Sequence, residues 1–138
     1  MKKNPLSILI LRFSSIGDII QSTSVIGTLK SYFPDSSIDF MTLSKFAPLV
    51  QNHPKINKVF LVDINDGYFA LRKIGLTIQE NGYDLVIDLH NTTRSRIIRK
   101  AMRKTKSLIL PKPRWKRFNL FMFHKNNFSS DFSVRSWL

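Results

Sequence analysis

The chain has 138 residues without cysteine, and 22 Lys and Arg stand against 9 Asp and Glu. This length suits one domain with one core, and 43% hydrophobic residues exclude a chain that is disordered throughout. The lack of cysteine excludes disulfides and thiolate metal ligands. No apolar run reaches the ~20 residues of a membrane-spanning helix, and the first residues (MKKN) lead directly into a strand pattern instead of a signal peptide. We therefore predict a cytoplasmic chain with at most peripheral membrane contact.

The positive charge lies mainly in the last third of the chain. Residues 1–93 hold 9 basic and 8 acidic side chains, whereas residues 94–138 hold 13 basic side chains and one acid, Asp131. Such a one-sided segment is typical of proteins that bind a phosphorylated lipid, a membrane surface or nucleic acid. It is also typical of a solvated face or a disordered tail, so charge alone does not choose between these interpretations.

A strand, a turn and a helix are predicted at the start of the chain. Residues 6–13 (LSILILRF) form a continuous branched apolar run, which is typical of a parallel strand covered on both faces. The turn at residues 14–18 (SSIGD) ends this run. Apolar side chains then recur at helical spacing from Ile19 to Phe33, and Pro34 ends the pattern.

The same alternation continues to residue 110. We predict a short helix or turn at 46–52, helices at 68–79 and 92–103, and strands at 37–43, 58–63, 83–89 and 107–110. Alternating helices and apolar strands predict an α/β fold, with a Rossmann-like, doubly wound parallel sheet over residues 1–110. Residues 111–138 form a separate basic and aromatic segment.

The turn after the first strand is the best candidate for chemistry, because ligands bind beyond the carboxyl ends of parallel strands. Arg12, Ser14 and Ser15 can donate hydrogen bonds to phosphate or carboxylate oxygens, and Gly17 permits a close approach. Asp18 has two interpretations. It suits a general base for a substrate hydroxyl, and on spacing alone it suits the N-cap of the following helix somewhat better.

Other catalytic patterns are missing from the sequence. It has no G-x-G-x-x-G, no Walker loop and no G-x-S-x-G elbow. Its three histidines lie far apart, so we assign them to the surface or to packing and expect neither a metal nor a cofactor. Asp88 follows a predicted strand and is expected either to line the crevice or, preferably, to hold the loop at residues 91–93.

Four segments in order carry a resemblance to a known family. They are residues 8–20 (ILILRFSSIGDII), YFPD at 32–35 with IDF at 38–40, HP at 53–54, and YDLVIDLH at 83–90 followed by Arg94 and Ser95. Together they resemble the glycosyltransferase family 9 enzymes, the bacterial lipopolysaccharide heptosyltransferases, over residues 6–123.

The resemblance implies the N-terminal half of a GT-B enzyme. In such enzymes the N-terminal domain binds a lipid-linked, anionic sugar acceptor and the C-terminal domain binds ADP-heptose. Transfer is inverting and needs no metal, and the acid that matches Asp18 is the proposed base. The expected substrate-binding residues are Arg12, Ser14, Ser15, Gly17, Arg94 and Arg117.

Two features depart from the family pattern. The chain ends where the donor domain is expected, so we predict a fragment that is inactive alone and meets an ADP-sugar only when a C-terminal domain is supplied. Residues 64–67 (INDG) replace a segment that tends to be basic in lipopolysaccharide heptosyltransferases. The acceptor and the transferred sugar therefore stay open.

The expected partners are an anionic glycolipid acceptor and, through the basic aromatic segment, the inner face of the bacterial inner membrane. Nucleic acid is not an expected partner of the enzyme. The alternative interpretation is a non-catalytic basic module that binds anionic lipid or nucleic acid through residues 94–135.

Overall fold

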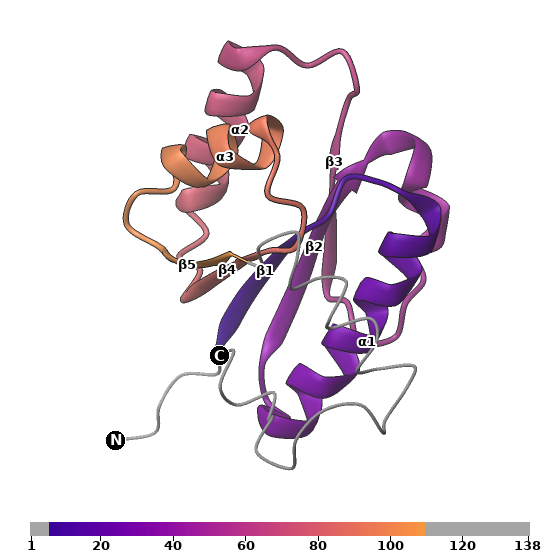
Figure 1. Ribbon diagram of the computed structural model, residues 1–138. Coiled ribbons are helices and arrows are strands. Elements are labelled where there is room, and N and C mark those ends of the chain that lie inside the picture. Colours follow the sequence, from indigo (N-terminus) through magenta and orange to yellow (C-terminus); the bar gives the residue numbers. More distant parts are fainter. Residues whose placement is uncertain (1–5, 110–138) are drawn as a thin grey trace, which may run out of the picture.

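β1 (Ser7–Leu11) is the central strand of a five-stranded parallel sheet in the computed structural model, which describes residues 6–109 (Figure 1). The strand order is β3-β2-β1-β4-β5. The other strands are β2 (Ser37–Leu43), β3 (Lys58–Val62), β4 (Leu85–Asp88) and β5 (Lys106–Ile109). The chain leaves β1 towards β2 and β3 and later crosses back to β4 and β5, which confirms the predicted doubly wound sheet.

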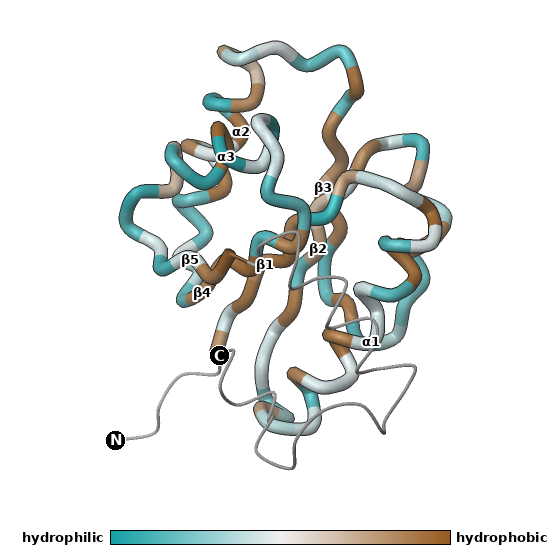
Figure 2. The backbone as a smooth tube through the Cα atoms, in the orientation of Figure 1, coloured by the Kyte–Doolittle hydropathy of each residue, from teal (hydrophilic) through white to brown (hydrophobic). Residues whose placement is uncertain are grey.

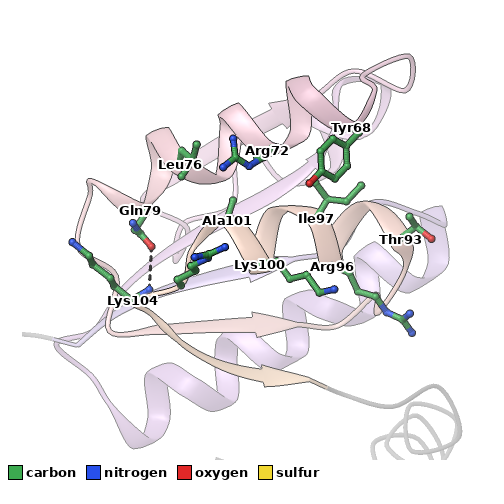
Figure 3. Close-up of a pocket in the computed structure, with 11 residues that line it drawn as sticks. Tyr68, Arg72, Leu76, Gln79, Thr93, Arg96, Ile97, Lys100, Ala101 and Lys104 are labelled. Carbon is green, nitrogen blue, oxygen red and sulfur yellow. Dashed lines mark hydrogen bonds between the residues drawn. The ribbon is translucent and has the colours of Figure 1, made fainter.

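Helices cover both faces of the sheet. Helix α1 (Ile16–Tyr32) lies on one face, whereas α2 (Tyr68–Gln79) and α3 (Thr93–Ala101) lie side by side on the other (Figures 1 and 3). A short 3-10 helix, η1 (Ser44–Leu49), follows β2 where a short helix or turn is predicted. The predicted bounds of α2 and β2 agree with the structure.

Two apolar cores explain the uninterrupted hydrophobic run of β1. Ile8 and Ile10 pack on the α1 face of the sheet, while Leu9 and Leu11 pack on the α2 and α3 face. All four side chains are fully buried. Figure 2 shows hydrophobic residues gathered along β1, β4 and β5 in the middle of the domain, and more hydrophilic residues on the helices and loops around them.

Several predicted boundaries differ from the structure by a few residues. Helix α1 begins at Ile16 rather than Ile19. Its start is set by a capping box between Ser15 and Asp18, which the spacing of apolar residues does not indicate. Strand β4 is shorter than predicted, and Asp84 instead accepts a hydrogen bond from the Ser7 amide at 2.8 Å. Helix α3 ends at Ala101. The predicted segment at 111–138 and Arg117 lie outside the described residues.

A buried polar cluster supports the amino-terminal side of the sheet. The Tyr83 hydroxyl donates to Asp39 Oδ2, and Asn57 Nδ2 donates to Asp39 Oδ1 at 3.2 Å. Burial raises the pKa of Tyr83, and its bond to Asp39 acts in the same direction. This cluster joins β2 to the residues just before β3 and β4, which gives the IDF and YD segments a structural role.

Gly75 sets the close packing of α2 against α3. A Cβ built there would lie 2.6 Å from both Ala101 Cβ and the Ile98 carbonyl oxygen. We predict that Gly75→Ala lowers the free energy of unfolding by about 1–3 kcal/mol, because overpacking outweighs the gain in helix propensity. Urea denaturation of the full chain measures this change.

Gly27→Ala in α1 is the matched control, since its Cβ would meet no atom within 4 Å. Alanine should stabilise the chain there by up to about 1 kcal/mol. Equal stabilisation by both substitutions would contradict the packing described for Gly75.

Candidate functional site

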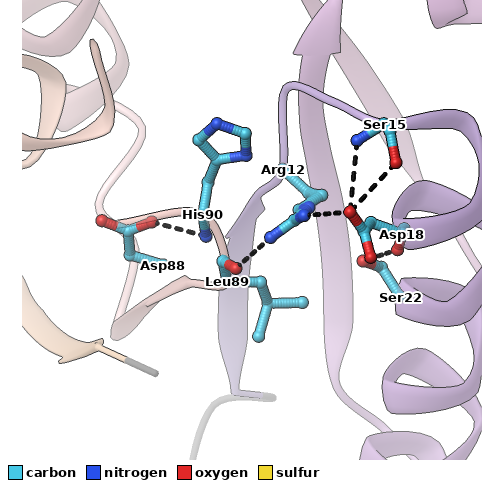
Figure 4. A network of polar contacts seen from close by, with 7 residues as sticks. All are labelled: Arg12, Ser15, Asp18, Ser22, Asp88, Leu89 and His90. Carbon is cyan, nitrogen blue, oxygen red and sulfur yellow. Dashed lines mark hydrogen bonds and ion pairs between the residues drawn. The ribbon is translucent and has the colours of Figure 1, made fainter. Parts of the chain in front are cut away.

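Arg12 connects three elements at the carboxyl edge of the sheet. It directly follows β1, and its side chain is only 10% exposed. Its Nη2 lies 2.6 Å from Asp18 Oδ2 on α1, and its Nη1 donates to the Leu89 carbonyl oxygen after β4 at 2.6 Å (Figure 4). Burial lowers the pKa of Arg12, while the nearby carboxylates of Asp18 and Asp88 oppose this shift. The guanidinium therefore holds the ends of β1 and β4 against the first turn of α1.

Asp18 lies inside the first turn of α1 as part of a capping box. Ser15 is the N-cap, and Asp18 Oδ2 accepts hydrogen bonds from the Ser15 hydroxyl at 3.0 Å and the Ser15 amide at 3.5 Å. The N-cap interpretation of Asp18 is therefore wrong, because that position belongs to Ser15. The Asp18 side chain is 31% exposed and pairs with Arg12 at the N-terminal end of α1. A charged, solvent-reachable carboxylate is what a general base requires.

The other residues of the turn surround Asp18 on the exposed side. Ser14 is half-buried, and Ser15 and Gly17 are exposed. A Cβ at Gly17 would meet no atom within 4 Å, so packing among the described residues does not require glycine there. The space above Gly17 is thus open to a ligand.

Arg94 reaches the same edge from the start of α3. Its guanidinium lies 6.0 Å from the centre of the Phe13 ring, and its Nη2 donates to the Ile64 carbonyl oxygen at 3.0 Å. His90 contacts Phe13 edge to face, with 5.8 Å between the ring centres. Phe13 therefore links Arg94 and His90 to the strand that carries Arg12, and Arg94 also holds the loop after β3.

Asp88 holds the β4–α3 loop, which is the role that the sequence favours over lining the crevice. Its fully buried carboxylate accepts hydrogen bonds from the His90 amide at 3.0 Å and the Asn91 amide at 2.8 Å. Its second oxygen lies 3.0 Å from Arg99 Nε. Asp88 is thus a structural acid that orients His90, not an exposed second base.

A cavity of about 400 Å³ opens beside these residues. It is lined by residues at the start of α2, in the β4–α3 loop and on α3, namely Asp66, Tyr68, Leu71, His90, Thr92, Thr93, Arg94 and Ile97. The sequence predicts a packing or surface role for His90. Its contact with Phe13 is packing, but it also lines this cavity, and the only sequence signal was its place directly after a strand.

Among residues 6–109, no three or more His, Asp or Glu side chains are grouped so that they could hold a metal ion. Over the same range, every helix is too short or too polar to cross a bilayer.

The chain is similar in sequence to known heptosyltransferases, although no protein-family profile matches it. Lipopolysaccharide heptosyltransferase 1 of Campylobacter coli is 29% identical over 129 residues, which are 93% of this chain and 34% of that protein. Lipooligosaccharide heptosyltransferase 2 of Haemophilus ducreyi is 35% identical over 96 residues, or 67% of this chain and 27% of that protein.

Solved structures show the same relationship. A glycosyl transferase family 9 protein from Veillonella parvula superposes with a TM-score of 0.67 at 22% identity, covering 79% of this chain and 32% of that one. ADP-heptose lps heptosyltransferase II of E. coli superposes with a TM-score of 0.62 at 25% identity, covering 78% and 36%. The resemblance to glycosyltransferase family 9 is confirmed. This heptosyltransferase-like chain spans 34% and 27% of the two curated relatives named above.

The ion pair between Arg12 and Asp18 should be detectable as an energetic coupling. We predict that Arg12→Gln and Asp18→Asn each destabilise the chain, and that the double variant loses less stability than the two single losses added together. The reason is that either substitution alone leaves a partly buried charge without its partner. The coupling energy should be about 1 kcal/mol or more, as measured by urea denaturation of the four chains in the cycle.

Arg12→Gln combined with Asp35→Asn serves as the control cycle, because Asp35 is exposed and forms no ion pair with another described residue. That pair should be additive. Additivity to within about 0.5 kcal/mol in the Arg12 and Asp18 cycle would contradict the described ion pair.

Proposed function

We propose that this heptosyltransferase-like chain is the acceptor-binding half of an inverting, metal-independent glycosyltransferase. In this proposal the complete enzyme transfers heptose from ADP-heptose to a lipopolysaccharide core acceptor. The similarity to named heptosyltransferases supports the reaction class. The observation that carries the proposal is the Asp18 carboxylate, held at the carboxyl edge by Arg12 and still 31% exposed.

The proposed chemistry is a single displacement. Asp18 takes the proton of an acceptor hydroxyl, and the acceptor oxygen forms a bond to the anomeric carbon of the donor sugar. The bond from that carbon to the diphosphate oxygen breaks, and ADP leaves with the electron pair. Attack from the side opposite the leaving group inverts the anomeric centre. One positioned base contributes about 10²–10⁴-fold to such a step.

The remaining residues of the edge orient the acceptor. Ser14 and Ser15 carry hydroxyl donors beside Asp18, and the open space above Gly17 admits a sugar ring close to the backbone. Arg12 is a positioning residue for Asp18 in the unliganded chain, and its contact with an anionic acceptor group remains part of the proposal. Arg94 supplies a second cation for the acceptor, because it lines the same cavity as His90.

The proposal assigns donor binding to a second domain, so the chain alone should not bind the nucleotide. We predict that calorimetry of residues 1–138 with ADP detects no saturable binding in the micromolar range. The reason is that the described residues offer no glycine-rich phosphate loop at the carboxyl edge. Micromolar binding of ADP would contradict the assignment of donor binding to a second domain.

Asp18→Asn tests the role of the base when the chain is joined to the donor domain of a family 9 relative. We predict that kcat falls at least about 100-fold, because the amide cannot accept the acceptor's proton. KM for the acceptor should change little. The melting temperature should also fall, since Asn retains the capping contacts but loses the charge that compensates Arg12.

Asp39→Asn is the matched control for this loss of stability. It makes the same carboxylate-to-amide change in the buried cluster with Tyr83 and Asn57, away from the carboxyl edge. This variant should melt earlier and keep kcat within about threefold of the unaltered fusion. A kcat for Asp18→Asn that matches the Asp39→Asn control would reduce Asp18 to a capping-box residue.

A further inference from the structure

The outer faces of α2 and α3 enclose a groove of about 610 Å³ that the proposed chemistry does not use (Figure 3). We call it the α2–α3 groove. Its apolar part comes from Leu76, Ile97 and Ala101, and its polar part includes Tyr68, Gln79 and Thr93. Five cations complete its lining, namely Arg72, Arg96, Lys100, Arg103 and Lys104.

The charge of this groove has one sign. No Asp or Glu belongs to its lining, and none of its five cations forms an ion pair with another residue of the described range. Exposed like charges that lie together repel one another, whereas an anionic occupant would turn this repulsion into attraction. Charge complementarity therefore indicates an anionic partner.

Apolar side chains accompany these cations on α2. Phe69 is 83% exposed, Tyr68 is 57% exposed, and their rings meet edge to face at 5.4 Å. Leu76 is 41% exposed. Bases together with exposed aromatic and aliphatic side chains on neighbouring helices are typical of proteins that lie at a lipid interface, where the aromatic rings enter the headgroup region and the bases meet lipid phosphates.

Neither residues 110–138 nor a second copy of the chain has the net negative charge that would complement the groove. Residues 110–138 carry six Lys and Arg against Asp131, so their charge has the same sign as the groove. A second copy of the chain would also bring net positive charge, since each copy carries +13. Both occupants are disfavoured by repulsion.

We propose that the α2–α3 groove docks the chain on an anionic phospholipid bilayer. The bases contact lipid phosphates, and Phe69 and Tyr68 enter the interface. This surface consists of described residues and differs from the segment at residues 111–138, for which the sequence predicts membrane contact. The proposal stands independently of heptosyl transfer, because it rests on the charge and shape of two helices.

The location of the groove relates it to the candidate site. Tyr68, Thr93 and Ile97 line both the groove and the cavity that contains His90 and Arg94. A bilayer that contacts the groove therefore lies next to the carboxyl edge. This geometry would place a membrane-held acceptor close to the turn at residues 14–18.

Vesicle flotation of the full chain tests the proposal. The groove variant combines Arg72→Gln, Arg96→Gln and Lys100→Gln, three exposed residues without a hydrogen bond or ion pair among the described contacts. The control variant removes the same charge from the β3 side through Lys45→Gln, Lys55→Gln and Lys58→Gln, which are also exposed. Vesicles contain phosphatidylcholine alone or phosphatidylcholine with about one quarter phosphatidylglycerol. Circular dichroism checks that each variant is folded.

The unaltered chain should float with phosphatidylglycerol vesicles and not with phosphatidylcholine alone. The groove variant should lose at least about tenfold in vesicle affinity, and the control variant less than about threefold. Phe69→Ser, at a side chain outside both cores, should weaken flotation without changing net charge.

Three results would overturn the proposal. Equal losses in the groove and control variants would show that only total charge matters. Unchanged flotation of the groove variant would place the contact elsewhere on the chain. Loss of affinity for a single-stranded oligonucleotide, with vesicle binding intact, would make the groove a nucleic-acid surface instead. None of these assays requires a donor domain or turnover, so they succeed or fail separately from the test of Asp18.

Discussion

The buried guanidinium of Arg12 is the interaction on which the candidate site depends. It lies between the Asp18 carboxylate on α1 and the Leu89 carbonyl oxygen after β4, at 2.6 Å from each. Only arginine offers several donors in a rigid planar fork, so lysine in its place could not satisfy both partners with the same geometry. Without this bridge, the first turn of α1 would be attached to the sheet mainly by the apolar contacts of Ile19 and the residues beyond it. The position of Asp18, the proposed base, therefore depends on contacts among the end of β1, the start of α1 and the segment after β4.

Polar groups are confined to the two ends of an otherwise apolar sheet. On the amino-terminal side, Asp39 is satisfied by Tyr83 and Asn57. At the carboxyl edge, Asp88 accepts two backbone amides and pairs with Arg99. Buried carboxylates are costly unless they are bonded in this way. Asp88 is fully engaged in support of the β4–α3 loop, whereas Asp18, beside the end of β1, retains access to solvent.

Much of the fold could be predicted from local patterns. The bounds of β2 and α2 follow from apolar periodicity, and the doubly wound parallel sheet follows from alternating helices and strands. The start of α1 could not be predicted in the same way, because its first turn depends on the capping box of Ser15 and Asp18 rather than on apolar spacing. The pairing of Arg12 with Asp18 and the shape of the α2–α3 groove were also out of reach, since both depend on tertiary contacts, the second on Gly75 lying against Ala101. The roles given to Arg94 and Gly17 in acceptor binding stay predictions.

The central claim is that an anionic sugar acceptor binds at the carboxyl edge around Asp18. Amide chemical shifts of the full chain, recorded by NMR during titration with a deacylated lipopolysaccharide core oligosaccharide, test it most directly and need neither donor nor turnover. The account predicts that the largest shifts fall on residues 14–18 and 90–94, with smaller ones along α2. Shifts confined to the amino-terminal side of the sheet around Asp39 and Tyr83, or no shifts at millimolar oligosaccharide, would contradict it.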